Sequence, residues 1–344
     1  MIIREVEKPD LKKIIKAIKF KSAPKPEFLS DVLSVGSGKG GIAIILQYLK
    51  EKGVIINKLD EVMVPDWLGY WVYNQIQPFA FPAKKISDRT KVLFVYHQYG
   101  FPQDMDKILE FAHDKKLIVI EDCAHALNSY YKGKLLGSMG DFAIYSFSKW
   151  FFCFALGGIR AKAEDFYDYA DGLIKQTPFG MTFTKDVIKF FYERSTFSTS
   201  KTFKKYMSYL LAMSYSLYGE SLKPSKIALK FFSKKIENEI NVRQRRYHYF
   251  FEKMRNLGIC DHLEEEGVTP YIMPIRCSES KSEEVLRALQ DRNIATGLYN
   301  FDINRNLLSP NFVPCIWVPC HSGISDEIFN NITDTIFKSC KNKK

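Results

Sequence analysis

The fold of this chain is decided by the stretch Val119-Ile-Glu-Asp-Cys-Ala-His-Ala126, followed by Gly140-Asp-Phe-Ala-Ile-Tyr-Ser-Phe-Ser-Lys149. Each stretch contains a short apolar run that is typical of a buried strand. Four polar side chains come after these runs: an acid, an imidazole, a hydroxyl and an amine, from Asp122, His125, Ser146 and Lys149. Ligands of open α/β sheets bind outside the carboxyl ends of the strands. We therefore expect these four side chains to form a binding site at that edge of a sheet.

The four residue types suit pyridoxal 5'-phosphate (PLP). A carboxylate at Asp122 would keep the pyridine nitrogen protonated, and the protonated ring accepts electrons from a neighbouring carbanion. Half-buried after an apolar run, the amine of Lys149 would lose part of its preference for the charged form and become nucleophilic. Ser146 is placed to donate to the phosphate, and His125 to meet the ring hydroxyl. The alternatives are a buried Asp122 paired with an arginine and a Lys149 on the surface; buried unpaired acids are costly.

An ordered series of motifs over about sixty residues resembles the DegT/DnrJ/EryC1/StrS family of fold-type I aminotransferases, the sugar aminotransferase family. The matching motifs are His97-Gln-Tyr-Gly100, Pro102-Gln-Asp-Met-Asp106, Glu121-Asp122, His125, Tyr131-Lys-Gly133, Gly137-Ser-Met-Gly-Asp141, Ser146-Phe147 and Gly157-Gly158. The resemblance implies that Asp122 binds the pyridine nitrogen, His125 the phenolic oxygen, Ser146 the phosphate and Lys149 the aldehyde carbon.

The surrounding pattern predicts a parallel sheet. Two apolar runs, 92–96 and 117–120, flank a helical stretch at 105–115, as buried parallel strands flank a crossover helix. A long helix is expected over 237–257, and shorter strands and helices after it. With the resemblance, the predicted fold class is α/β: a fold-type I PLP-dependent transferase with a large three-layer, mainly parallel domain (1–235) and a smaller C-terminal α/β domain (236–344).

A glycine-rich turn, Gly38-Lys-Gly-Gly41, leads into a predicted helix over 42–50. The free amide groups at the start of a helix can hold a phosphate. The family has a related turn with a small hydroxyl residue near the place of Lys39. Gly38 and Gly40 are therefore expected to offer backbone donors, and Lys39 is a candidate contact. Alternatively, the glycines only close a tight turn.

The resemblance also implies an aromatic ring stacked on the cofactor. Trp67, Tyr70 and Trp71 are the candidates, although core packing is the alternative for at least two of them. For the substrate pocket the candidates are Tyr299 and His321, where a structural histidine is the alternative. Because the family's active site lies at a homodimer interface, residues 241–246, Arg243 among them, are candidates for the partner's phosphate or substrate.

The chain departs from the family pattern at two places. Residues 76–92 are shorter than usual and lack the room for an additional strand and an acidic segment, which puts a nucleotide-sugar specificity in question. The lysine also comes one or two residues early, and Trp-Phe-Phe-Cys-Phe-Ala-Leu follows it in place of a Gly-Glu-Gly-Gly-like turn. Lys149 is nevertheless the only lysine between Lys134 and Lys162.

Within a basic, aromatic helical segment at about 163–235, residues 201–235 carry eight lysines and one acid. Such a segment can contact anionic lipid or a phosphorylated substrate; the alternative is a solvated helical face that packs on a dimer partner. The net charge is +11, yet no nucleic-acid-binding module is visible. No apolar run is long enough to span a bilayer, so membrane contact would be peripheral.

The seven cysteines are scattered, without a Cys-x-x-Cys pair or a histidine cluster at zinc spacing, which favours a reduced cytoplasmic protein without a metal site. By resemblance, we expect a homodimeric aminotransferase that takes an amino group from glutamate or glutamine and passes it to a keto sugar, nucleotide-linked, for surface polysaccharide or a related glycan. Two alternatives remain: a non-catalytic cofactor- or sugar-binding protein on the same scaffold, and a PLP-dependent sugar dehydratase. The dehydratases replace the lysine with histidine, so Lys149 argues against the latter.

Overall fold

The structure is a computed structural model that describes residues 2–19, 23–263 and 266–341. Its central sheet has seven strands, in the spatial order β1 (Leu33–Val35), β9 (Gly157–Ala161), β8 (Phe142–Tyr145), β5 (Ile118–Asp122), β4 (Thr90–Tyr96), β2 (Glu61–Met63) and β3 (Phe81–Ala83). The strands from β8 to β3 pair in parallel, and β9 pairs antiparallel with β8 and β1. The sheet is therefore mainly parallel, as predicted.

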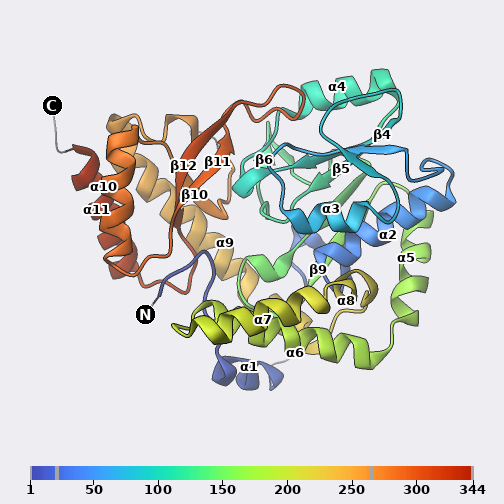
Figure 1. The fold of residues 1–344 in the computed structure, drawn as a ribbon, viewed down its shortest axis with the longest axis horizontal. Helices are drawn as coiled ribbons and strands as arrows, with labels where there is room; N and C mark the ends of the chain where they lie inside the picture. The colour runs from blue at the N-terminus through green and yellow to red at the C-terminus, as the bar shows by residue number, and fades with distance from the viewer. Residues whose placement is uncertain (1, 20–22, 264–265, 342–344) are drawn as a thin grey trace.

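Alternating apolar side chains bury both faces of this sheet. Along β4, Val92 and Phe94 belong to one core cluster, whereas Leu93 and Val95 belong to another. Since side chains of a strand alternate between faces, each cluster lies on its own side. The first is covered by α2 (Gly38–Glu51), α3 (Tyr70–Ile76) and α5 (Asp165–Gln176), and the second by α4 (Met105–Lys115) and α9 (Lys226–Met254). Helix, sheet and helix form the three layers (Figure 1).

The C-terminal part builds a smaller α/β unit with a core of its own. Its antiparallel sheet has the order β10 (Ile272–Ile275), β12 (Phe312–Pro319) and β11 (Leu298–Asp302), and α10 (Glu279–Gln290) and α11 (Asp326–Lys341) pack together beside it. The predicted fold class is thus confirmed. The expected helix over 237–257 begins earlier, because Ser225 caps α9 by accepting a hydrogen bond from the Ala228 amide at 3.2 Å. α9 therefore runs through residue 235, where the two domains were divided.

The segment that sequence marks as short still holds a strand. β3 lies within 76–92 and pairs in parallel with β2 at the edge of the sheet. Its burial is slight at Phe81, whose side chain is 56% exposed. The shortening therefore leaves an edge strand of three residues in place.

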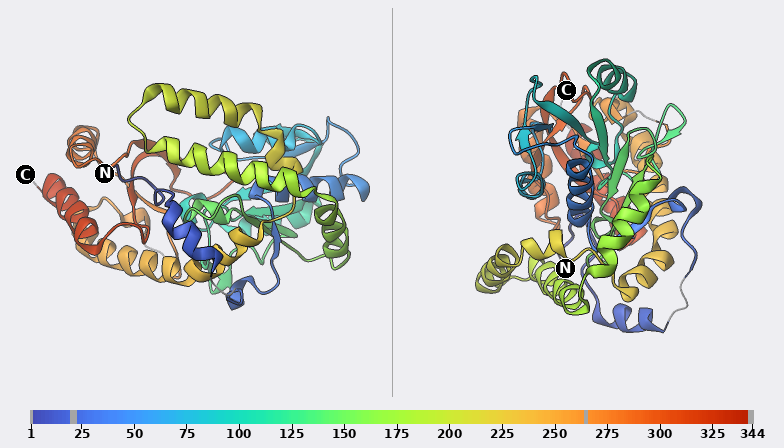
Figure 2. Two further views of the ribbon diagram at one scale, coloured as in Figure 1. Left: turned by 90° about the horizontal axis from the view of Figure 1, so that it is seen from below. Right: turned by 90° about the vertical axis from the view of Figure 1, so that its right-hand side faces the viewer.

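The basic aromatic segment at about 163–235 is helical, as predicted. Between α5 and α9 it contains α6 (Phe179–Thr196), α7 (Lys201–Met213) and α8 (Ser216–Glu220). α6 and α7 pack against each other, with α7 on the outside of the molecule and α1 (Leu11–Ile18) nearby (Figure 2). In the part of the chain that the structure describes, no helix is both long and apolar enough to cross a membrane.

Short elements complete the chain. The hairpin β6 (Tyr130–Tyr131) and β7 (Lys134–Leu135) follows β5, and five 3-10 turns lie at Glu27–Leu29, Gln98–Gly100, Phe147–Lys149, Arg255–Leu257 and Asp261–Leu263. The third of these turns begins directly after β8 and carries Lys149. It therefore sets the position of the amine at the carboxyl edge of the sheet.

Candidate active site

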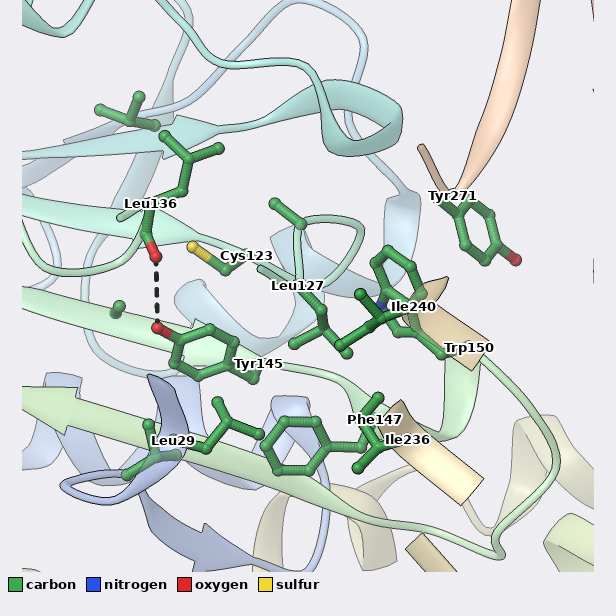
Figure 3. Close-up of a cluster of buried hydrophobic side chains, with 14 of the residues drawn as sticks. Leu29, Cys123, Leu127, Leu136, Tyr145, Phe147, Trp150, Ile236, Ile240 and Tyr271 are labelled. Carbon is green, nitrogen blue, oxygen red and sulfur yellow. Dashed lines mark hydrogen bonds between the residues drawn. The ribbon is translucent and has the colours of Figure 1, made fainter. Parts of the chain in front are cut away.

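The turn that carries Lys149 is anchored on both sides. Phe147 is 2% exposed and Trp150 is fully buried, and both belong to the core cluster beneath the sheet (Figure 3). The indole Nε1 of Trp150 also donates a hydrogen bond to the carbonyl of Ala124 at 3.3 Å. Because two large neighbours are buried, the backbone of Lys149 is fixed while its side chain extends into the open space above the sheet edge.

In that space Lys149 lies near two predicted residues at the carboxyl end of β5, Asp122 and His125. Its Nζ lies 3.1 Å from Nε2 of His125. Asp122 ends β5 and is 3% exposed; its Oδ1 accepts a hydrogen bond from the Ala124 amide at 2.9 Å. The structure therefore brings Asp122, His125 and Lys149 together at one edge of the sheet, where they line the same cavity.

Burial changes the protonation of all three groups. It raises the pKa of Asp122 to about 6, although the Ala124 amide and Lys149 favour the charged form. Burial away from water lowers the pKa of the Lys149 amine, while the negative charge of Asp122 raises it. Burial, then the positive charges of Lys149 and Arg243, hold the pKa of His125 well below its usual range. His125 is therefore a neutral imidazole beside an amine that releases its proton more readily than an exposed lysine.

An aromatic stack fixes the ring of His125. The Tyr271 ring, which precedes β10, lies parallel to it with 4.1 Å between ring centroids and 4° between planes. On its other nitrogen, Nδ1 makes a hydrogen bond with the hydroxyl of Tyr96, the last residue of β4. The imidazole is thus held by packing and by both ring nitrogens, so its orientation toward Lys149 is defined.

Arg243 is buried in the protein interior and does not line the cavity around Lys149. Its guanidinium pairs with Glu239 at 2.5 Å, donates to the carbonyl of Trp150 at 3.0 Å and donates to the carbonyl of Tyr271. The residue predicted to contact substrate therefore holds together the turn that carries the amine and the ring that covers His125.

The start of α2 offers amide groups beside Ser146. Ser37 caps the helix, since its Oγ accepts a hydrogen bond from the Gly40 amide at 3.0 Å. That cap uses Gly40, so the amides of Gly38 and Lys39 remain as donors of the first turn. A β-carbon on Gly38 would lie 3.2 Å from Cβ of Ser146. The start of α2 and the Ser146 side chain thus meet at one corner of the cavity, and free amides at a helix start are the kind of donors that can hold an anion.

The Lys39 side chain sits among three aromatic rings. Its Nζ lies 4.2 Å from the ring centroid of Tyr215, 4.7 Å from that of Trp71 and 4.8 Å from that of Tyr218. Burial, then the nearby charges of Lys189 and Lys149, lower the pKa of Lys39 to about 7. Cation–π contacts stabilise the ammonium there, yet no carboxylate of the described residues forms an ion pair with it. Lys39 can therefore pair with a bound anion.

These groups line one cavity of about 860 Å³. Two further candidates lie on its wall, Trp67 and Tyr299, whose side chains are 55% and 53% exposed. Tyr70 is outside the cavity lining and is 70% exposed, beside Trp71. His321 is also outside it: its Nε2 contacts the carbonyl of Arg4 at 3.0 Å, and burial lowers its pKa to about 4.

Sequence reasoning missed several residues of the wall. Tyr96 ends β4 beside Asp122 on β5, so the parallel register could have identified it. Six more carry no local signal, because they come from the helical segment and the chain start and meet only in the folded protein. They are Arg4, Glu5, Lys189, Tyr192, Leu211 and Tyr218.

Solved structures share this fold over the whole chain. TlmJ, an aminotransferase from Streptoalloteichus hindustanus, superimposes with a TM-score of 0.67 at 15% identity, covering 98% of this chain and 99% of its own. PseC of Helicobacter pylori, an aminotransferase involved in the biosynthesis of pseudoaminic acid, has a TM-score of 0.67 at 12% identity, and both chains are covered completely. The fold is that of the fold-type I aminotransferases.

Residues 75–168 match the DegT/DnrJ/EryC1/StrS aminotransferase family. GDP-perosamine synthase of Escherichia coli O157:H7 is 48% identical over 64 residues, which are 19% of this chain and 18% of that protein. This chain thus matches about a fifth of the length of that curated relative. The resemblance that the motifs indicated is confirmed, and the matched residues include Asp122, His125 and Lys149 of the site.

Proposed function

We propose that this chain is a PLP-dependent aminotransferase. The observation that carries the proposal is the convergence of Asp122, His125 and Lys149 at the carboxyl edge of β5 and β8, with Lys149 Nζ 3.1 Å from His125. A buried acid, a neutral imidazole and an amine with a lowered pKa are unusual neighbours in a core, and perturbed groups in a cavity favour a catalytic role.

The side chains of the cavity fit PLP. Asp122 is buried with one oxygen bonded to an amide and opens onto the cavity, so it would accept a hydrogen bond from a protonated ring nitrogen. Ser146 and the amides of Gly38 and Lys39 would hold the phosphate. Lys149 would bind the aldehyde carbon. When bound, the cofactor supplies an electron sink for the carbanion that forms next to a substrate nitrogen.

The residues around Lys149 are suited to moving a proton. The amine of Lys149 is nucleophilic when neutral. Burial lowers the pKa of this amine and so increases its neutral fraction. His125 can accept a proton at Nε2 from the ammonium or return it, since the two nitrogens are within hydrogen-bond reach. We assign Lys149 the general acid and base role, and Asp122 the role of holding the ring nitrogen in its protonated form.

For the substrates, we propose glutamate or glutamine as amino donor and a keto sugar, nucleotide-linked, as acceptor in glycan biosynthesis. The name GDP-perosamine synthase and the description of PseC support a sugar acceptor. The cavity of about 860 Å³ is large enough for a sugar beside the cofactor. Tyr299 and Trp67 are the proposed substrate contacts, because both line that cavity and are half exposed at its rim.

We also propose a cytoplasmic homodimer with a shared active site. In the described part of the chain the scattered cysteines form no disulfide, which supports a reducing compartment. Exposed aromatic rings at the cavity rim, Trp67 and Tyr299, support contact with a second copy at that rim. Sedimentation velocity of the purified protein measures the oligomeric state: a monomer at every concentration would rule out the dimer.

The first experiment is the visible absorption spectrum of the protein mixed with PLP, before and after glutamate is added. We expect a band of lysine-bound cofactor that fades with glutamate, and no such band for Lys149→Ala. Lys134→Ala, on the exposed hairpin, is the matched control and should keep the band. If the wild type forms no lysine-bound band, the catalytic proposal fails, and a non-catalytic binding protein on this scaffold takes its place.

A further inference from the structure

Three helices form one face of the molecule. α1, α6 and α7 lie at the bottom of Figure 1 and side by side when the protein is seen from below in Figure 2. Large apolar side chains are exposed on all three, and we call them the helical face: Leu11, Ile15, Phe179, Phe183, Phe191, Phe203, Tyr206, Tyr209, Leu210 and Met213. Exposed apolar residues concentrated on one face indicate contact with another molecule or surface.

On α7, the exposed residues form a continuous stripe. Phe203, Tyr206, Leu210 and Met213 follow a spacing of three, four and three residues, and Met213 is 85% exposed. The side of α7 next to this stripe, about a quarter turn away, buries Met207 and Leu211, and Leu211 lines the cavity. A surface helix usually has one apolar stripe, which faces its own core. α7 has a second one that faces away from the protein.

The charge of the exposed side chains on α7 has one sign. Lys201, Lys204 and Lys205 lie on the side of α7 away from the stripe, and residues 194–219 contain no acid. On α6, the acid Asp186 is buried and Glu193 forms an ion pair with Lys189. α1 adds lysines and has no acid within its bounds. The exposed part of the helical face is therefore apolar and cationic, which complements an anionic surface.

We propose that the helical face docks on an anionic lipid bilayer. Amphipathic helices with lysines beside aromatic and aliphatic residues lie in the interface of such membranes, and tyrosine rings are favoured at the level of the headgroups. A second copy of the chain fits less well, because a two-fold contact would bring the lysines of one face against those of the other. The inference does not depend on the aminotransferase activity.

The test is sedimentation of the purified full-length protein with vesicles. We expect binding to vesicles of phosphatidylglycerol and phosphatidylcholine, little binding to phosphatidylcholine alone, and weaker binding as salt is added. Lys201→Gln, Lys204→Gln and Lys205→Gln together should lower the partition coefficient on the order of 100-fold, about fivefold for each lysine. Leu210→Ser with Met213→Ser should also lower it on the order of 100-fold, because the exposed parts of both side chains no longer enter the bilayer.

Matched control variants remove equal groups elsewhere. Ile56→Ser with Leu59→Ser takes away exposed apolar side chains of a loop outside the helical face, and Lys58→Gln, Lys85→Gln and Lys115→Gln together take away three exposed lysines. Both controls should bind vesicles as the wild type does. Circular dichroism monitors folding of every variant.

The proposal is overturned if the wild type stays in the supernatant with every vesicle composition, or if the controls lose as much binding as the face variants. It is also overturned if light scattering shows that Leu210→Ser with Met213→Ser splits an oligomer while vesicle binding is unchanged. The face would then bind a second copy of the chain.

Discussion

The buried carboxylate of Asp122 should lower the free energy of unfolding of the cofactor-free protein. Bound cofactor should restore that free energy. Burial raises its pKa from 3.8 to about 6. One unit of pKa corresponds to about 1.4 kcal/mol, so the ionised form destabilises the folded chain by about 3 kcal/mol. Because the pKa is raised on folding, the folded protein holds the proton longer. Stability is therefore lost as pH rises from about 4 through about 6.

Asp122→Asn isolates this effect. An amide oxygen can still accept the hydrogen bond of the Ala124 amide, and no charge is buried. In urea unfolding followed by circular dichroism, the cofactor-free variant should match the wild type to within about 1 kcal/mol near pH 4. By about pH 8 it should have gained roughly 2–3 kcal/mol over the wild type. With PLP added, the order should reverse, since the variant lacks the negative charge opposite the ring nitrogen.

Two outcomes would refute the reasoning. One is a difference in unfolding free energy between Asp122→Asn and wild type that does not change with pH. The other is PLP stabilising both proteins equally, because Asp122 would then make no contact with the charged ring nitrogen. Glu110→Gln, which removes an exposed carboxylate on α4, serves as the control and should show neither effect.

Three other predictions concern residues around the site. In the wild type, PLP affinity should fall as pH rises through about 7, because the Lys39 ammonium loses its proton there. Lys39→Met should not show this fall. Calorimetric titrations with PLP below and above that pH measure the affinity, and an equal change of affinity with pH in both proteins would contradict the prediction. Glu121→Gln should lower the free energy of unfolding by roughly 3–5 kcal/mol, since the buried carboxylate accepts hydrogen bonds from His97 and from three backbone amides; urea unfolding above pH 5 measures it, and a loss under 1 kcal/mol would contradict it. Arg243→Met should weaken PLP binding at least tenfold and also shift the absorption band of lysine-bound PLP, because the turn of Lys149 loses its brace; lost stability with an unchanged band and affinity would leave Arg243 a purely structural role.

The cavity residues that the sequence could identify lie within a few positions of a strand end. Asp122 and His125 follow one apolar run, Ser146 and Lys149 follow the next, and the parallel pairing of β5 and β8 makes neighbours of them. A strand's period and its end are local properties, so the pattern alone places such residues on one edge. The same logic covers the helix start at Gly38, whose cap is the adjacent Ser37.

The rest of the cavity depends on contacts between distant parts of the chain. Tyr271 stacks on His125 across almost half of the sequence, and Lys189 and Tyr192 reach the cavity from α6. Nothing in the composition of α6 marks these two among its other lysines and aromatic residues. Arg243 illustrates the reverse case: a basic residue in a basic stretch suggested a ligand contact, whereas its buried hydrogen bonds are all internal.

The charged side chains in and around the cavity shift one another's pKa values. Lys39, Lys149 and Lys189 lie close enough that the last two lower the pKa of the first, whereas the acids Asp122 and Glu193 face the other two lysines. Without a bound anion, the Lys39 ammonium contacts aromatic rings and loses its proton near neutral pH. A phosphate at the start of α2 would supply the missing negative charge, and the ammonium would then be favoured again. Lys39 stands near the place of the family's small hydroxyl residue. Phosphate binding would therefore favour the protonated form of Lys39, and protonation of Lys39 would strengthen phosphate binding.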